Sequence, residues 1–177
     1  MKLIYSIALA RSICVLLVLT SLSNINGMNQ FEVDQSLLKA VSNNNVEKVQ
    51  ELLEQEANPN AFDPEYSITI LHAAAREGNV EIIKQLINAG ADLNKRSGTN
   101  KITPLLAAIY KGHLTAVRLL LEAHANPNKT GRFGITPMEA AAAEDRVDIG
   151  RELLKHNADL KSNNKEWREK LNISMLQ

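Results

Sequence analysis

The sequence predicts an all-α fold, a solenoid of stacked helix-turn-helix units with protruding loops, and three observations lead to that prediction. Thr69, Thr103 and Thr136 each precede a short apolar segment, and they are spaced by 34 and 33 residues. A glycine or an aspartate follows each threonine after nine residues, and a second apolar segment begins two residues later. Aromatic residues make up only 4% of the chain, which fits helices packed through alanine and leucine better than a β-sandwich. A period of about 33 residues indicates tandem repeats of one helical unit.

The clearest unit begins at Thr103. Its hydroxyl can cap a helix, and Pro104 suits the first helical position because its missing N–H would have no partner there. Gly112 can adopt the left-handed conformation that ends a helix, and the leucine-rich segment after it has one apolar face. We therefore expect helices at 104–111 and 114–124, followed by an extended loop.

The other copies contain the same two helices in the same order. We expect these helices at 35–42 and 46–55 in the first copy, at 70–77 and 80–89 in the second, and at 137–144 and 147–156 in the fourth. The charged segment near the C-terminus predicts one more short helix at 165–171. We expect Trp167 of this segment to lay its ring over the apolar end of the last copy.

The motifs of these copies indicate a family that the chain resembles. The T-P-L-H start of the ankyrin repeat resembles T-I-L-H at 69–72, T-P-L-L at 103–106 and T-P-M-E at 136–139. Its G-A-D-x-N end matches G-A-D-L-N at 90–94. The chain is therefore similar to the ankyrin repeat family over about residues 34–161. The resemblance implies four tandem repeats, with the first and last acting as caps because an end repeat has one face in solvent.

The predicted organisation divides the chain into seven parts. They are a signal peptide at 1–23, a polar leader at 24–33, repeats at 34–67 (N-terminal cap), 68–101, 102–134 and 135–162 (C-terminal cap), and a short helix with a tail at 163–177.

Residues 1–23 have the features of a secretory signal peptide. Lys2 and Arg11 supply positive charge, an apolar run follows, and Ser21 and Ser23 are small residues of the kind that a signal peptidase recognises. The apolar run at 12–22 is shorter than the roughly 20 residues of a membrane-spanning helix. We therefore expect a secreted or periplasmic protein with no stable membrane span after cleavage. The alternative is a protein that is membrane-anchored by an uncleaved signal.

No combination of residues predicts catalysis or metal binding. Cys14 is the only cysteine, so the chain can form no intrachain disulfide and no cysteine-based zinc site. His72 occupies the histidine position of the family motif, where the resemblance implies that its ring bonds within the turn. His124 and His156 fall in adjacent copies but out of register, which does not suit two ligands of one metal. We expect no enzyme activity, no metal and no cofactor.

The resemblance implies that the inner helices and the loop tips line a concave face, where residues without a core role can contact a partner. Tyr110 and Phe133 are expected to have no core role, and exposed aromatic residues are typical anchors of interfaces. The second and third loop tips carry five basic residues and no acid, although plain solvated loops would show the same charges. The predicted partner-binding residues are Tyr66, Arg76, Glu77, Lys95, Arg96, Lys101, Tyr110, Lys111, Lys129, Arg132, Phe133 and Glu144.

Together these features predict a non-enzymatic scaffold that mediates protein–protein interaction, is exported, and exists as a monomer with an unknown protein partner. The formal net charge is +0, so the whole molecule has no electrostatic preference for a specific nucleic acid. The alternative function is an electrostatic binder of an anionic surface or polyanion through the basic loop tips. Such binding should weaken steeply as salt is raised.

Overall fold

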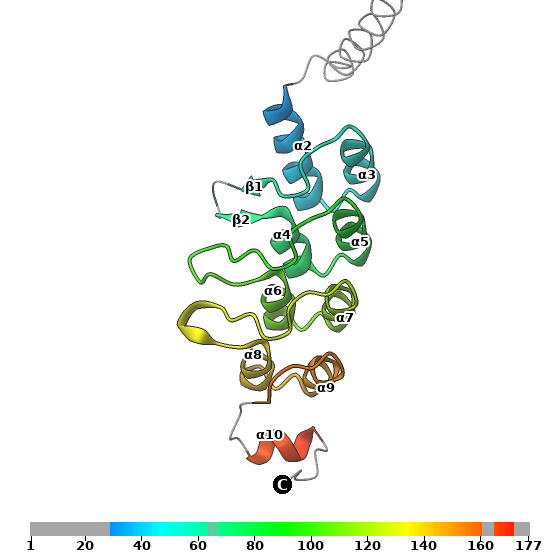
Figure 1. The fold of residues 1–177 in the computed structure, drawn as a ribbon. Coiled ribbons are helices and arrows are strands. Elements are labelled where there is room, and N and C mark those ends of the chain that lie inside the picture. The colour runs from blue at the N-terminus through cyan, green and yellow to red at the C-terminus, as the bar shows by residue number, and fades with distance from the viewer. Residues whose placement is uncertain (1–28, 64, 66, 161–164, 172–177) are drawn as a thin grey trace, which may run out of the picture.

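The computed structural model describes residues 29–63, 65, 67–160 and 165–171, so the expected signal peptide at 1–23 lies outside the described residues. The described helices form an elongated solenoid of two columns, with loops projecting to one side (Figure 1). The inner column consists of α2 (Gln30–Ser42), α4 (Ile70–Glu77), α6 (Pro104–Lys111) and α8 (Pro137–Ala143). The outer column consists of α3 (Val46–Glu54), α5 (Val80–Asn88), α7 (Leu114–Glu122) and α9 (Val147–Lys155). This architecture confirms the predicted all-α solenoid.

Local sequence signals set the ends of the helices. The Thr103 hydroxyl accepts a hydrogen bond from the backbone N–H of Leu106, and Pro104 occupies the first turn of α6. Gly112 ends that helix at φ 74°, in the left-handed region that a glycine adopts without steric cost. Gly78 ends α4 in the same way, and a Cβ there would lie 2.6 Å from the His113 ring. Glycine is therefore needed at Gly78 both for its backbone angle and for the close approach of the next repeat.

The first inner helix begins earlier than expected. Helix α2 begins at Gln30, five residues before the predicted start, so the end of the predicted polar leader at 24–33 is helical. The reason is a capping box. The Asn29 side chain accepts from the backbone N–H of Glu32, whose carboxylate accepts from the backbone N–H of Asn29, both at 3.0 Å.

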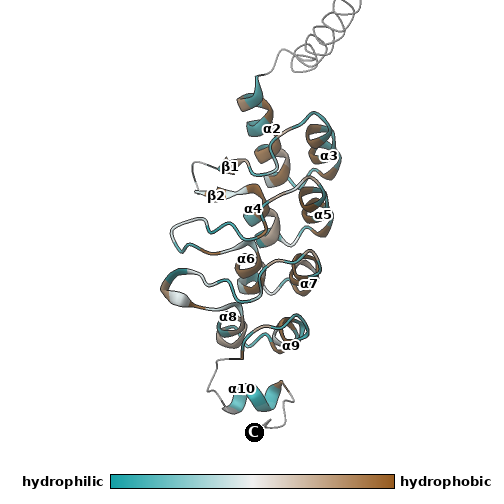
Figure 2. Ribbon diagram, viewed as in Figure 1, coloured by the Kyte–Doolittle hydropathy of each residue, from teal (hydrophilic) through white to brown (hydrophobic). Residues whose placement is uncertain are grey.

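Apolar residues fill the space between the two columns. The fully buried side chains include large aliphatic residues of both columns, so the core runs from one repeat to the next. Figure 2 shows hydrophobic residues in the helices of both columns, among them α3, α5, α6 and α7. Among the described residues, no helix is both long enough and apolar enough to cross a bilayer.

A ladder of side-chain hydrogen bonds links α2 to the segment after α3, and then links each such segment to the following one. Its acceptors are the side-chain oxygens of Asp34, Asn60, Asn94 and Asn128. The backbone N–H groups that donate to them belong, in the same order, to Asn58, Asp92, Asn126 and Asp159, at 2.8, 2.7, 2.8 and 2.7 Å. A polar bond of one kind therefore recurs along the solenoid beside the apolar core.

A short helix, α10 (Lys165–Lys170), covers the C-terminal end of the solenoid (Figure 1). Trp167 is only 2% exposed, and the aromatic ring lies so close to α9 that a Cβ on Gly150 would be 2.8 Å from it. This confirms the prediction that Trp167 packs over the last repeat.

The loops also contain structure that the sequence analysis did not anticipate. Strands β1 (Phe62–Asp63) and β2 (Ile68–Thr69) form an antiparallel hairpin in the first loop. The next loop has an isolated antiparallel bridge between Ser97 and Ile102. The third contains a single 3-10 turn, η1 (Arg132–Gly134).

Candidate functional site

Three loops project from the same side of the solenoid, and we call them finger 1 (61–69), finger 2 (95–102) and finger 3 (129–135) (Figure 1). Backbone hydrogen bonds join them in series. Gly98 N–H donates to the Ser67 carbonyl at 2.6 Å, and Arg132 N–H donates to the Asn100 carbonyl at 2.9 Å. The fingers therefore form one connected surface whose parts are fixed relative to one another.

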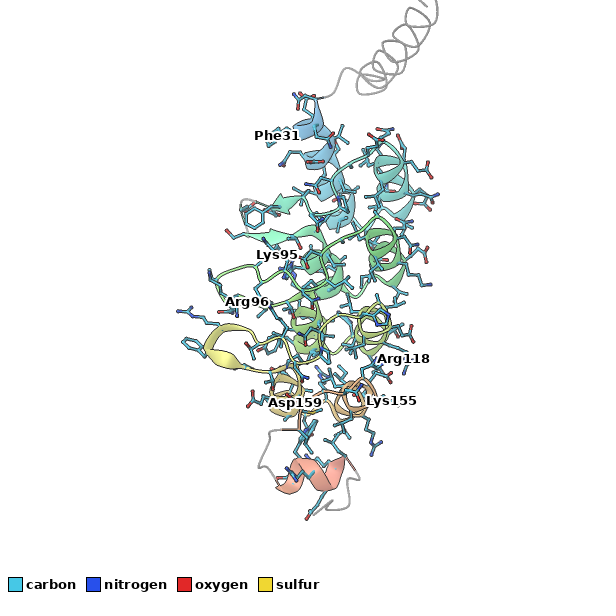
Figure 3. The ribbon with its side chains drawn as sticks, viewed as in Figure 1. Phe31, Lys95, Arg96, Arg118, Lys155 and Asp159 are labelled. Atoms are coloured by element: carbon cyan, nitrogen blue, oxygen red, sulfur yellow. The ribbon has the colours of Figure 1, made fainter. Side chains whose placement is uncertain are left out.

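Finger 2 is a tight hairpin that presents its basic residues outward. Ser97 and Ile102 exchange backbone hydrogen bonds of 2.9 and 3.1 Å, and Lys101 adopts a left-handed φ of 49° at the end of the turn. Lys95, Arg96 and Lys101 are all exposed. Figure 3 shows Lys95 and Arg96 on the side of the molecule from which the fingers project.

Finger 3 combines a cation with the most exposed aromatic ring among the described residues. Phe133 is 84% exposed and has a left-handed φ of 60°. The Arg132 guanidinium carbon lies 4.7 Å from the centre of its ring, within the range of a cation–π contact. Lys129 and Arg132 are exposed, and Arg96 of finger 2 reaches the Thr130 carbonyl at 3.5 Å. The structure thus brings the predicted basic residues of the second and third loop tips onto adjoining fingers.

Finger 1 differs from the other two in charge. It carries Asp63 and Glu65 and no basic residue, and the Asp63 carboxylate accepts from the Glu65 backbone N–H at 2.8 Å. Phe62 adds an exposed aromatic residue that the sequence analysis did not select. The predicted contact residue Tyr66 lies outside the described residues.

The predicted residues of the inner helices lie near the ends of those helices. Arg76 and Glu77 are both exposed and pair with each other at 3.1 Å. Lys111 and Glu144 are also exposed, each at the C-terminal end of its helix. These side chains meet solvent, as a contact surface requires.

Tyr110 is a correction to the sequence analysis, which expected no core role for it. Its ring is half-buried and packs against the hydrophobic core. Burial raises the pKa of its hydroxyl, and the negative charge of Glu144 raises it further. The residue is amphipathic, so that one side of the ring stabilises the inner column while the rest remains accessible.

His72 and His113 link neighbouring repeats. The Thr69 hydroxyl lies 2.7 Å from His72 Nδ1, and His72 Nε2 lies 2.9 Å from the Ile102 carbonyl. A carbonyl can only accept, so Nε2 donates and Nδ1 accepts from the hydroxyl; burial lowers the pKa of this imidazole. His113 Nε2 similarly donates to the Arg76 carbonyl at 3.0 Å. The expected bond of His72 within its turn is confirmed, whereas its bond to the next repeat was missed.

The outer column contains a buried carboxylate that the sequence analysis also missed. Glu152 of α9 is 5% exposed and accepts hydrogen bonds from Arg118 of α7 at 3.3 Å and from Lys155 at 3.0 Å. Burial, the largest influence, raises the pKa of Glu152, but the hydrogen bonds of the two cations outweigh it, and the net pKa is lowered. Figure 3 shows Arg118 and Lys155 on the outer column, away from the fingers. This cluster joins two repeats and belongs to the framework.

No group of three or more histidine, cysteine, aspartate or glutamate residues within the described part of the chain is placed to hold a metal ion. A depression on the outer column, between α3 and α5, is lined by Gln50, Leu53, Glu54, Glu81, Gln85, Asn88 and Ala89. This depression is open to solvent and brings together no nucleophile and base. The finger surface and the exposed ends of the inner helices are therefore the candidate site.

Comparison with known families identifies a match over most of the chain. A family model for ankyrin repeats, in three copies, matches residues 3–97 and 71–164. No curated protein matches the chain.

Proposed function

Because the chain belongs to the ankyrin repeat family, we propose that it is a non-enzymatic scaffold that binds another protein through its concave face and its fingers. Ankyrin repeats are generally protein-interaction scaffolds, and the family is typically non-enzymatic. The proposal further assigns four repeats to the chain, one for each helix pair at α2–α3, α4–α5, α6–α7 and α8–α9.

The observation that carries this proposal is the connection of the three fingers through backbone hydrogen bonds. The bonds from Gly98 to Ser67 and from Arg132 to Asn100 fix the spacing of exposed side chains on neighbouring repeats. A surface whose parts are already fixed loses little conformational entropy when it binds. Phe133 supplies an exposed aromatic side chain, a residue type that is enriched among the strong contacts of interfaces.

Photo-crosslinking in the native cell extract tests which face binds. A photoreactive phenylalanine analogue is placed at Phe133 or Lys111 in one set of variants, and at Glu47 or Glu122 of the outer helices in the control set. All four positions are exposed, so the substitutions should leave the fold intact. We expect covalent adducts with another protein from the first set only. Equal adduct formation from the outer helices would contradict the proposal.

We also propose that residues 1–23 direct export to a secreted or periplasmic location. The charge, the apolar run and the small residues of this segment support the proposal. N-terminal sequencing of the purified protein tests it. A mature chain that begins near residue 24 supports cleavage, whereas an intact N-terminus in the membrane fraction would support an uncleaved anchor. The family match begins at residue 3, so an intact N-terminus in the soluble fraction would argue for an extension of the repeat array and against export.

A further inference from the structure

We propose that fingers 2 and 3 bind an acidic segment of the partner protein, with an apolar side chain of that segment packed against Phe133. This inference rests on the proposed scaffold function and specifies the chemistry of the partner.

Fingers 2 and 3 together carry five cations. Lys95, Arg96, Lys101, Lys129 and Arg132 are all exposed. Within the part of the chain that the structure describes, no carboxylate lies within ion-pair distance of any of them. By contrast, several exposed lysines of the helices, such as Lys48 and Lys84, pair with a glutamate on the same helix. The finger cations therefore remain available for carboxylates of another molecule.

The cations of the two fingers are held close together by hydrogen bonds between the fingers. Finger 3 is bonded to finger 2 through the backbone of Arg132 and Asn100, and Arg96 reaches the Thr130 carbonyl. Like charges on free loops would move apart, which would reduce the local potential. Here the solenoid fixes the two fingers side by side, so their positive potential adds and complements an acidic segment that runs along both.

The sign of the charge changes from negative on finger 1 to positive on finger 2. Finger 1 carries Asp63 and Glu65, and it is bonded to finger 2 through Ser67 and Gly98. A nucleic-acid strand or an anionic bilayer that spread over all three fingers would meet these carboxylates and be repelled. A protein segment can carry acidic residues opposite fingers 2 and 3 and a basic residue opposite finger 1. The charge pattern therefore favours a protein over a uniform polyanion.

On finger 3, Phe133 lies next to the guanidinium of Arg132. The ring is 84% exposed, and the guanidinium lies 4.7 Å from its centre. An apolar side chain on the ring and a carboxylate on the guanidinium would then be neighbours in the bound segment. Ile135, two residues further along finger 3, is also exposed and adds to the apolar surface of this finger. The expected ligand is a segment in which an aliphatic residue stands next to glutamates or aspartates.

Fluorescence anisotropy with the purified protein and labelled synthetic peptides tests the inference. The first peptide carries several glutamates and one leucine in a glycine–serine background; the matched peptides replace every glutamate by glutamine, or the leucine by serine. We expect the glutamate peptide to bind about tenfold more tightly than the glutamine peptide, and the difference to shrink at high salt. We expect the Lys95→Glu/Arg132→Glu variant to lose about tenfold in affinity.

Two control variants test whether binding depends on fingers 2 and 3 rather than on the net charge of the protein alone. The Lys48→Glu/Lys84→Glu variant has the same change in net charge but lies on the outer helices, so it should bind the glutamate peptide as the wild type does. Phe133→Ser should weaken the leucine peptide and leave the serine peptide unchanged. Circular dichroism confirms that each variant is folded.

Several results would overturn the inference. They are equal binding of the glutamate and glutamine peptides, no binding of the glutamate peptide at about 1 mM, and tighter binding of oligothymidylate or of phosphatidylserine vesicles than of the glutamate peptide. The scaffold proposal fails separately, because it depends on the adducts formed at Phe133 and Lys111. If those adducts persist while the peptide tests fail, the chain binds a partner that is not acidic.

Discussion

The first and the last described helices of the solenoid, α2 and α10, are stabilised in different ways. At the C-terminal end, α10 places Trp167 and Leu171 against the last outer helix, and both are almost fully buried. At the N-terminal end of the described chain, Phe31 of α2 is 70% exposed, and the helix is stabilised by polar groups. Asp34 of α2 provides the ladder acceptor that an asparagine provides in the later repeats. A buried aromatic residue therefore covers the C-terminal side of α9, whereas the first turn of α2 is exposed and is held by hydrogen bonds.

A single position in the outer helices explains how the C-terminal end accepts its extra helix. Val49, Ile83 and Val117 occupy the fourth position of α3, α5 and α7, and each is fully buried. Gly150 occupies the same position in α9, where the Trp167 ring fills the space that a larger side chain would take. The last repeat thus contains a glycine where the others have an aliphatic residue, and the missing volume comes from α10.

The largest expected effect is the loss of the Trp167 ring, compared with the loss of the exposed Phe31 ring in α2. Trp167→Ala should lower the free energy of unfolding by about 3 to 5 kcal/mol, because it removes a large buried ring and leaves a cavity. Phe31→Ala should change it by less than about 0.5 kcal/mol, because the ring is exposed. Urea denaturation followed by circular dichroism measures both. Equal losses would show that α2 and α10 are stabilised alike.

The next effect sharpens the role of Gly150. Gly150→Val should destabilise the protein by about 1 to 3 kcal/mol, because the added side chain overlaps the Trp167 ring. In a Trp167→Ala background the same substitution should be less destabilising, since the ring is no longer there. The double-mutant cycle in urea gives this coupling directly. Independent effects of the two substitutions would argue against their contact.

A third comparison concerns two glutamates at the same helical position, Glu51 of α3 and Glu152 of α9. Glu152→Gln should cost about 1 to 2 kcal/mol near neutral pH, because it weakens hydrogen bonds to Arg118 and Lys155 at a buried site. Glu51→Gln should have little effect, because Glu51 is exposed and its pKa is lowered mainly by a surface hydrogen bond from Lys48.

The pH dependence of Glu152 follows from the direction of its shift. Its folded pKa lies below the ordinary value, so the ionised carboxylate adds stability that is fully present above that ordinary value. This contribution is lost as the pH falls through the lowered pKa. The difference in stability between the wild type and Glu152→Gln should therefore shrink on acidification, as urea titrations at several pH values would show. A constant difference would contradict the assignment.

The smallest expected effect is at the N-terminal capping box. Asn29→Ala should cost about 0.5 to 1 kcal/mol, toward the lower part of the usual range, because the first turn of α2 is exposed. Asn29→Asp keeps the acceptor and should retain the stability of the wild type. Hydrogen exchange of the first amides of α2 measures the fraying locally. Unchanged exchange in the alanine variant would show that the box does not hold this end.

The sequence was sufficient for the features that depend on spacing. The helix ends at Thr103 and Gly112 follow from local signals, and Trp167 was expected over the last repeat because it lies in the short charged segment that follows that repeat. The early start of α2 was missed although Asn29 and Glu32 have the spacing of a capping box.

Other features depend on contacts between residues far apart in the chain. The burial of Glu152 requires Arg118, which lies 34 residues away on another helix, and the pattern of α9 alone marks Glu152 as polar. The bonds between fingers join backbone groups, which carry no signature in the sequence. For the same reason, the exposed tips could be selected as contact residues, but their mutual arrangement could not be predicted.

The side-chain ladder has a consequence for how such a chain can change its length. Asn60, Asn94 and Asn128 stand 34 residues apart, and each makes the same bond to the following repeat. Because the same hydrogen bond links each of these repeats to the next, a repeat can be duplicated or deleted by unequal recombination. No new contact between repeats then has to evolve. The number of repeats, and with it the number of fingers, can therefore change while the first and last described helices keep the same contacts.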